Sequence, residues 1–276
     1  MNPAAYGEMA LIEDQHWWFV ARRKILAEII KKLPLPQSPH ILEVGFGTGG
    51  NLVMLATFGK VKAFDMSQEA CAITAEKLET LGFNSAQIEL AQGSCPDHMP
   101  FDPMNNPEMQ FDLICVFDVL EHIREDAQTL INLKKYLKPN GLIFLTVPAY
   151  QWLYGPHDQY VYHERRYSKK SLKKVLKQAK YFNILKISYF NTFLFPPAVL
   201  VRLKEKIFQA FNHAKQRDQE NQDETERQGM PKIPSSFLNK IFQKIFASES
   251  FFLKKISLPA GLSILCVLQV AVDENE

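Results

Sequence analysis

The stretch ILEVGFGTGGNL, residues 41–52, constrains the fold more than any other part of this sequence. Gly45, Gly47 and Gly50 satisfy the spacing G-x-G-x-x-G, which is typical of a tight turn between a buried strand and a helix. Glycine permits such a turn and lets the backbone approach a ligand closely, because it carries no Cβ. The stretch therefore predicts a strand–turn–helix unit that could hold an adenosine.

Segments typical of buried strands alternate with segments typical of helices along most of the chain. Strands buried on both faces are apolar runs, whereas helices repeat apolar residues three and four positions apart. The alternation predicts an α/β fold: a doubly wound, Rossmann-like, mostly parallel seven-stranded sheet with helices on both faces. The expected strands are 41–45, 61–65, 86–93, 111–119, 142–148, 183–190 and 261–272, and the expected helices are 16–33, 48–59, 67–82, 125–141 and 168–182.

The 276 residues are expected to form a single domain, 1–276, with four parts. These are an N-terminal helical segment (1–36), a cofactor-binding core (37–191), a helical insertion or lid (192–260), and the last strand with a tail (261–276). Inside the insertion, the polar stretch near 212–231 has no aromatic residue and is expected to be a mobile loop.

The composition excludes several classes of function. A formal net charge of +2 gives the chain no overall attraction to nucleic acid. The N-terminus lacks the pattern of a signal peptide, and the longest apolar stretch, 258–272, is too short to cross a bilayer. The four cysteines form no C-x-x-C pair and the histidines lack ligand spacing, so no metal is expected. We expect a cytoplasmic protein with reduced cysteines.

Two acidic residues help to distinguish the possible adenosine ligands. Asp65 ends the second expected strand, where a carboxylate can accept hydrogen bonds from ribose hydroxyls. NAD and S-adenosylmethionine would both use that geometry. Glu43 stands just before the turn, where it would repel a pyrophosphate but could hold the positively charged α-amino group of S-adenosylmethionine, directly or through water. Glu43 therefore favours S-adenosylmethionine.

Five blocks in order carry a family resemblance: ILEVGFGTGG, VKAFDMS, QGSCPDHMPF, FDLICVFDVLEHI and YLKPNGLIFLTVP. Together they resemble class I S-adenosylmethionine-dependent methyltransferases, in particular the type 11/12 small-molecule group, over roughly 41–190. HWWFVARRKIL and YHERRYS are similar to a bacterial subgroup of that family. The resemblance implies transfer of a methyl group from S-adenosylmethionine to a small molecule, with release of S-adenosylhomocysteine.

The resemblance also implies which residues hold the cofactor. The glycine turn would lie under the methionine part, Asp65 would bind the ribose, and Met66 would pack on the adenine. Arg22 is a further candidate, which could reach the cofactor carboxylate across the turn. The full set is Arg22, Glu43, Gly45, Phe46, Gly47, Thr48, Gly49, Asp65, Met66, Ser94, Cys95, Asp118, Val119 and Leu120.

Two later segments could act on the acceptor. His122 directly follows the fourth expected strand and could serve as a general base; alternatively, Leu120-Glu121-His122 only shapes the loop. The loop after the fifth strand concentrates polar groups, and its arginines could grip a carboxylate or phosphate or could hold the loop in place. The candidate acceptor-binding residues are His157, Asp158, Tyr162, His163, Arg165, Arg166 and Tyr167.

The insertion leaves two roles open. Leu238, Ile241, Phe242 and Ile245 form an apolar helical stripe, with Asn239, Lys240, Gln243 and Lys244 opposite. We expect this helix to cover the acceptor pocket; alternatively, it also touches an anionic membrane at the inner face and admits a lipid-linked acceptor. Two rival functions stay open, an NAD-dependent oxidoreductase and a non-catalytic cofactor-binding module.

Overall fold

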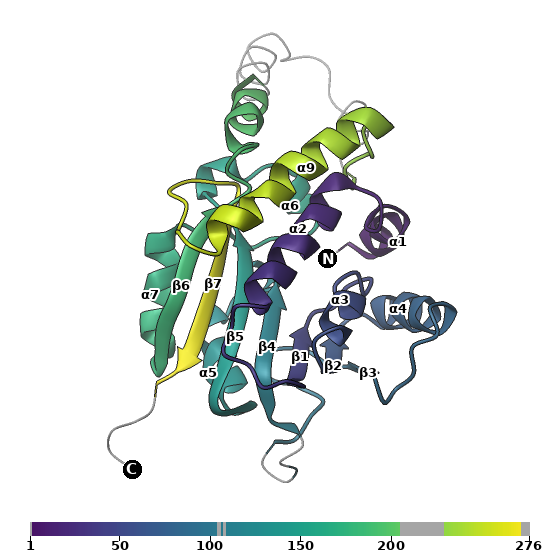
Figure 1. Ribbon diagram of the computed structural model, residues 1–276, viewed down its shortest axis with the longest axis vertical. Coiled ribbons are helices and arrows are strands. Elements are labelled where there is room, and N and C mark those ends of the chain that lie inside the picture. The colour runs from purple at the N-terminus through teal and green to yellow at the C-terminus, as the bar shows by residue number, and fades with distance from the viewer. Residues whose placement is uncertain (1, 104–105, 107–108, 205–228, 272–276) are drawn as a thin grey trace, which may run out of the picture.

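A seven-stranded sheet forms the centre of the protein (Figure 1). The computed structural model describes residues 2–103, 106, 109–204 and 229–271. Within them the strand order is β3-β2-β1-β4-β5-β7-β6. The strands are β1 (His40–Val44), β2 (Lys60–Asp65), β3 (Ile88–Gln92), β4 (Phe111–Phe117), β5 (Leu137–Pro148), β6 (Phe182–Phe190) and β7 (Ser263–Val270).

The strands are parallel except for β7, which runs antiparallel to both of its neighbours, β5 and β6. This confirms the predicted doubly wound, mostly parallel sheet. β1 pairs with β2 on one side and with β4 on the other, so the chain order reverses between β1 and β4. In such sheets ligands bind outside the carboxyl ends of the strands at this reversal. The glycine turn follows β1 and therefore lies at that point.

Helices cover both faces of the sheet. Apolar residues of α2, α3 and α9 pack with Ile41, Leu113 and Phe144 on one face. Residues of α5 and α7 pack with Ile114 and Leu145 on the other. The helices are α1 (Pro3–Ile12), α2 (Trp17–Ile30), α3 (Leu52–Ala56), α4 (Gln68–Thr80), α5 (Asp126–Lys134), α6 (Pro156–Tyr160), α7 (Lys169–Ala179) and α9 (Ser236–Leu253), with short 3₁₀ turns η2 (Leu120–His122) and η3 (Gln151–Leu153).

The predicted helix 125–141 is wrong in its second half. α5 ends at Lys134, and Leu137, which lies within the expected helix, is the first residue of β5 and pairs with Phe111. The last residues of the expected helix, 139–141, lie inside the strand instead. Asn140 has a positive φ of 63°, and the pairing of β4 with β5 shifts register at this point. Pro139-Asn140-Gly141 therefore forms an irregularity in a strand.

The N-terminal part of the chain contains more helix than we predicted. α2 confirms the helix expected at 16–33, but α1 precedes it. The expected helix 48–59 is much shorter, because α3 begins only at Leu52 and residues 48–51 still belong to the turn.

The insertion packs against the N-terminal helices. The ring of Trp17 at the start of α2 contacts the rings of Phe242 and Phe246 of α9. The Asn239 side chain accepts a hydrogen bond from the backbone N–H of Trp17 and donates one to the carbonyl of Gln15. Two segments that are far apart in the sequence thus lie side by side (Figure 1).

The buried face of α9 differs from the predicted stripe. Leu238 is 44% exposed, whereas Phe246, Glu249 and Leu253 are buried. In the first half of the helix Phe242 contacts Trp17 of α2, and in the second half Phe246 stacks on Phe190 of β6. Of the expected polar loop, residues 212–228 lie outside the described residues. Within the described ranges, no helix is long and apolar enough to cross a membrane.

Candidate active site

A cavity of about 1150 Å³ opens at the carboxyl ends of β1, β2 and β4. The glycine turn and Asp65 form one end, and residues of the loop 148–166 form the other. Two stretches of the insertion, 191–202 and 230–234, contribute the rest; we call their cavity-lining residues the insertion wall. Ligand pockets in proteins commonly have about 300–1,000 Å³, so the cavity is large enough for a cofactor together with a small acceptor.

The turn after β1 requires glycine. Gly45, Gly47 and Gly49 all have positive φ, at 69°, 57° and 79°. A Cβ on Gly45 would lie 2.6 Å from a methyl carbon of Val119, and one on Gly49 would lie 2.6 Å from Thr74. Both the backbone angles and the close neighbours therefore exclude larger side chains here.

Asp65 joins the glycine turn to the end of β2. One carboxylate oxygen accepts a hydrogen bond from the N–H of Gly47 at 2.9 Å, and the other accepts one from the N–H of Ser67, also at 2.9 Å. A carboxylate has about four acceptor positions, so two remain for a ligand. Because Asp65 also lines the cavity, its position suits the predicted contact with two ribose hydroxyls.

Glu43 lies behind the cavity wall. Its side chain is buried, and one oxygen accepts a hydrogen bond from the amide of Asn51, which does line the cavity. The other oxygen has no hydrogen-bond partner among the described residues. Burial raises the pKa of Glu43 to about 8, so the carboxyl group is mostly protonated at pH 7.

Arg22 and Asp118 form an ion pair at the cavity surface, with 2.6 Å between guanidinium and carboxylate. The guanidinium also donates to the hydroxyl of Thr146 and lies over the rings of Trp18 and Phe117. This pairing offsets the charge of Arg22, so a cofactor carboxylate would have to share the guanidinium with Asp118.

The predicted cofactor residues separate into two groups by position. Those that line the cavity are Arg22, Gly45, Phe46, Gly47, Asp65, Met66, Ser94, Cys95, Asp118 and Val119. Glu43, Thr48, Gly49 and Leu120 do not line it and are buried behind it.

Asp158 organises the predicted acceptor loop from its interior. Its carboxylate is fully buried, accepts a hydrogen bond from the N–H of Gly155, and contacts His163 Nδ1 at 2.7 Å and Arg166 Nε at 2.8 Å. Burial raises the pKa of Asp158, but the hydrogen bonds from His163 and Arg166 outweigh burial and hold the pKa below its usual range. Asp158 therefore positions its neighbours and does not face the cavity.

The other loop residues also take different positions. His157, His163 and Arg166 line the cavity. Arg165 instead donates to the carbonyl of Ile123 and pairs with Asp126, which holds the loop in place. Tyr167 is buried and its hydroxyl donates to the same Asp126, while Tyr162 is 57% exposed and does not line the cavity.

His122 lines the cavity beside His163. Burial and the neighbouring His163 lower the pKa of His122 to about 3. The imidazole is therefore neutral at physiological pH, but a base of such low pKa retains an abstracted proton poorly.

Sequence reasoning missed the contribution of α1. Tyr6, Met9 and Glu13 line the cavity near the glycine turn. Glu13 pairs with Lys77 of α4 at 2.7 Å and holds α1 in place. The turn and strand patterns that identify the core carry no information about a helix that packs on it from outside. Trp17, Trp18 and Phe19 also line the cavity.

Most of the chain matches a known protein family. Residues 18–245 match the sequence model of a family described as "Methyltransferase domain". The sterol 4-C-methyltransferase strm-1 of Caenorhabditis elegans is 26% identical over 122 residues, which are 44% of this chain and 34% of that protein. The chain thus spans about a third of the length of this curated relative.

Solved structures share the fold at low sequence identity. The [4+2]-cyclase SpnF superposes with a TM-score of 0.56 and 16% identity over 91% of this chain and 81% of its own. Phosphoethanolamine N-methyltransferase 2 of Haemonchus contortus, in complex with S-adenosyl-L-methionine, gives a TM-score of 0.54 and 17% identity, covering 90% of this chain and 52% of that one. Both support the fold alone.

Asp158→Asn should destabilise the protein by about 3–5 kcal/mol at pH 7, because it leaves Arg166 buried without its counter-charge. The folded pKa of Asp158 is lowered, so its stabilisation is present above about pH 4 and is lost as the pH falls through the folded pKa. Urea unfolding at pH 7 and pH 3 measures both effects. Glu164→Gln, which removes a partly exposed partner of Arg124, is the control and should cost less than about 1 kcal/mol. Equal losses in both variants would contradict the assignment.

Proposed function

Because this chain belongs to the methyltransferase-domain family and is an S-adenosylmethionine-dependent methyltransferase, we propose that its acceptor is a small amphiphilic molecule, anionic or lipid-linked, held at the loop end of the cavity. The observation that carries the proposal is the continuity of one cavity from the glycine turn and Asp65 to His163 and Arg166. A methyl donor and an acceptor can therefore meet within a single enclosed space.

The cofactor half of the cavity suits S-adenosylmethionine, which supplies a methyl group on a positively charged sulfur. Asp65 accepts hydrogen bonds from the ribose hydroxyls, and Met66 covers the adenine. Glu43 holds the α-amino group through Asn51 or a water molecule, since both of those can reach the cavity. These residues fix the sulfonium so that the methyl carbon faces the loop end.

The acceptor half combines apolar and charged groups. Trp17, Phe19, Leu153 and Val161 line the cavity and suit an apolar body. Arg166 also lines the cavity. It is paired with Asp158, but its other guanidinium N–H groups can donate hydrogen bonds to an anionic oxygen of the acceptor. An acceptor with an apolar body and an anionic group fits both features.

The insertion wall continues this apolar lining to the protein surface, which supports entry of the acceptor into the cavity from a membrane. Val201 lines the cavity and is also 56% exposed, beside Leu200, which is 60% exposed. Phe237, at the start of α9, is 74% exposed. Lys240 and Lys244 are exposed on α9. We place the protein in the cytoplasm, in peripheral contact with an anionic membrane face.

The two rival functions are not favoured. Membership of a methyltransferase family does not suit an NAD-dependent oxidoreductase. A non-catalytic module of the same fold would bind S-adenosylhomocysteine without transferring a labelled methyl group from S-adenosylmethionine to any lipid or metabolite extract. Calorimetry with S-adenosylhomocysteine and with NAD, followed by that transfer assay, distinguishes all three.

Asp65→Ala should weaken S-adenosylhomocysteine binding while the protein stays folded. Removing hydrogen bonds to a charged group costs about 1.5–3 kcal/mol, or roughly 10- to 150-fold in affinity. Isothermal calorimetry gives the affinity, and circular dichroism checks the fold. Glu76→Ala removes an exposed carboxylate from α4 as the control and should bind normally. Unchanged affinity in Asp65→Ala would remove Asp65 from the site.

Cofactor binding at pH 7 should release up to about one proton, because a nearby ammonium group favours the ionised form of Glu43, whose pKa of about 8 keeps it protonated beforehand. Calorimetry of S-adenosylhomocysteine in buffers with different ionisation enthalpies counts the protons. Glu43→Gln should abolish the release and Glu76→Gln should retain it. Identical release in both variants would assign the proton to another group.

The protein should float with anionic phosphatidylglycerol vesicles at low salt. With neutral vesicles it should stay in the bottom fraction. Lys240→Glu/Lys244→Glu should abolish flotation, since each lysine near such a surface contributes about 1 kcal/mol. Lys174→Glu/Lys177→Glu makes the same charge change on α7, on the opposite face of the sheet, and should float normally. Failure of the unaltered protein to float would leave the insertion as a cover for a soluble acceptor.

A further inference from the structure

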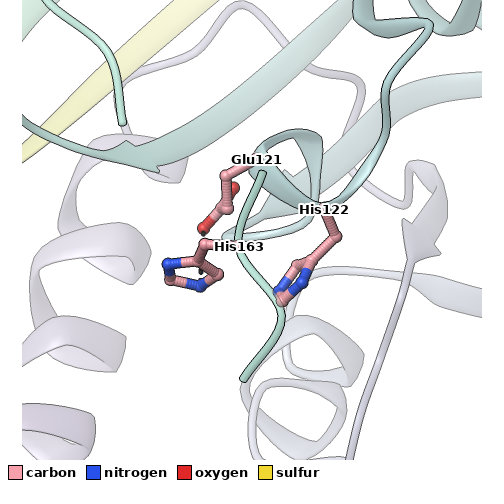
Figure 2. A group of neighbouring side chains, drawn as sticks. All are labelled: Glu121, His122 and His163. Atoms are coloured by element: carbon pink, nitrogen blue, oxygen red, sulfur yellow. Dashed lines mark ion pairs between the residues drawn. The ribbon is translucent and has the colours of Figure 1, made fainter. Parts of the chain in front are cut away.

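Glu121, His122 and His163 form a compact group at the acceptor end of the cavity (Figure 2). Each offers one nitrogen or oxygen atom, and these atoms all lie within 4.8 Å of one another. Glu121 and His122 belong to η2, immediately after β4, whereas His163 comes from the loop that follows α6. All three residues line the cavity, so a solute can reach the group.

Both imidazoles are oriented by an acceptor on their Nδ1 side. His122 Nδ1 lies 3.2 Å from the carbonyl of Tyr162, and His163 Nδ1 lies 2.7 Å from the carboxylate of Asp158. A carbonyl and an ionised carboxylate only accept hydrogen bonds, so each Nδ1 carries the proton. The lone pair of each ring is then on Nε2. A carboxylate or carbonyl behind a histidine is the arrangement that orients histidines as metal ligands.

Glu121 lacks the partner that a buried carboxylate needs. Its side chain is 0% exposed, and within the described residues neither oxygen makes a hydrogen bond. His163 Nε2 lies 3.8 Å from one of its oxygens, which is too far for a hydrogen bond, and Figure 2 shows the carboxylate directed toward that ring. An unpaired buried carboxylate is costly, whereas a cation between it and the two imidazoles would offset the cost.

We propose that Glu121, His122 and His163 bind one divalent transition-metal ion of the Zn²⁺ type, with an open coordination position toward the cavity. Two histidines and one glutamate are a ligand set of catalytic zinc sites, which keep a fourth position for water or substrate. With bonds of about 2.0–2.2 Å, a tetrahedral ion holds its ligand atoms roughly 3.3–3.6 Å apart. The ligand atoms, which lie within 4.8 Å of one another, therefore need to approach by at most about 1.2–1.5 Å.

The expectation of no metal rested on spacing along the sequence. His122 follows Glu121 directly, which is not a ligand spacing on a helix or hairpin, and His163 is far away in the chain. The fold supplies the missing proximity, because Glu164 N–H donates to the carbonyl of Glu121 and holds the His163 segment against η2.

The ion would define the acceptor chemistry, an inference that rests on the proposed function. An acceptor hydroxyl bound at the open position would lose its proton to water, because a metal ion stabilises the alkoxide or phenolate. The oxygen would then form a bond to the methyl carbon while the carbon–sulfur bond breaks and its electron pair stays on sulfur. The acceptor would thus be a hydroxyl group, and His122 would serve as a ligand in place of a general base.

Metal binding can be measured without any acceptor. The full chain, stripped with a chelator, is titrated with Co²⁺ and the visible absorption bands of the coordinated ion are recorded, with Zn²⁺ then added to displace it. We expect one ion per chain, bound at micromolar or lower Kd. Glu121→Gln and His163→Ala should each weaken binding by at least about 10- to 100-fold. His98→Ala, which removes an exposed histidine outside the group, should bind as the unaltered protein does.

The outcomes separate this inference from the proposed function. Absence of Co²⁺ and Zn²⁺ binding below about 100 µM, or equal binding by Glu121→Gln and His98→Ala, would overturn the metal site. Glu121→Gln is nearly isosteric, and circular dichroism excludes unfolding as the cause of a loss. S-adenosylhomocysteine binding is measured on the metal-free protein in parallel: if it persists when no metal binds, the proposed function stands without the metal site.

Discussion

The close contact between the turn after β1 and the turn after β4 sets the geometry of the whole cavity. Gly45 and Val119 approach so closely that a Cβ on Gly45 would lie 2.6 Å from a Val119 methyl carbon. The contact brings the end of β1 beside the end of β4 at the point where strand order reverses. Asp118 and Glu121 follow β4 directly, so their positions relative to the glycine turn depend on this contact. A side chain at Gly45 would force Val119 to shift.

Charged groups around the cavity mostly occur in buried pairs, and the exceptions are informative. Arg22 pairs with Asp118, Arg166 with Asp158, and Lys77 with Glu13. A buried pair contributes little net stability but fixes the orientation of both members. Glu43 and Glu121 instead keep buried oxygens without partners in the described part of the chain. Glu43 lies behind the cofactor half and Glu121 beside the acceptor half, where a positively charged ligand group would supply the missing partner.

The sequence predicts the sheet and the glycine turn well, because both depend on local patterns. Apolar runs identify the strands, and the positive φ values at Gly45, Gly47 and Gly49 follow from the glycines themselves. The acceptor half depends on contacts between distant segments, which no local pattern records. The loop histidines and arginines could be recognised as polar candidates, but only the fold separates Arg166, on the cavity, from Arg165, which binds Asp126. The stripe predicted for α9 holds only in part for the same reason: Phe242 packs on Trp17, whereas Leu238, nearer the start of the helix, is 44% exposed.

The sheet and the segments that surround it would have different roles under the proposed function. Residues at the strand ends are placed by backbone pairing and tolerate little displacement, so they suit a cofactor that all turnovers share. Under the proposed function, acceptor contacts would come largely from the N-terminal helices, the loop and the insertion wall. These segments are held to one another by side chains such as Trp17 on Phe246 and Asn239 on the start of α2. Substitutions in those segments can change the acceptor space without disturbing the strand ends. Under that proposal, the strand ends would position the methyl donor, and the segments packed around the sheet would select the acceptor.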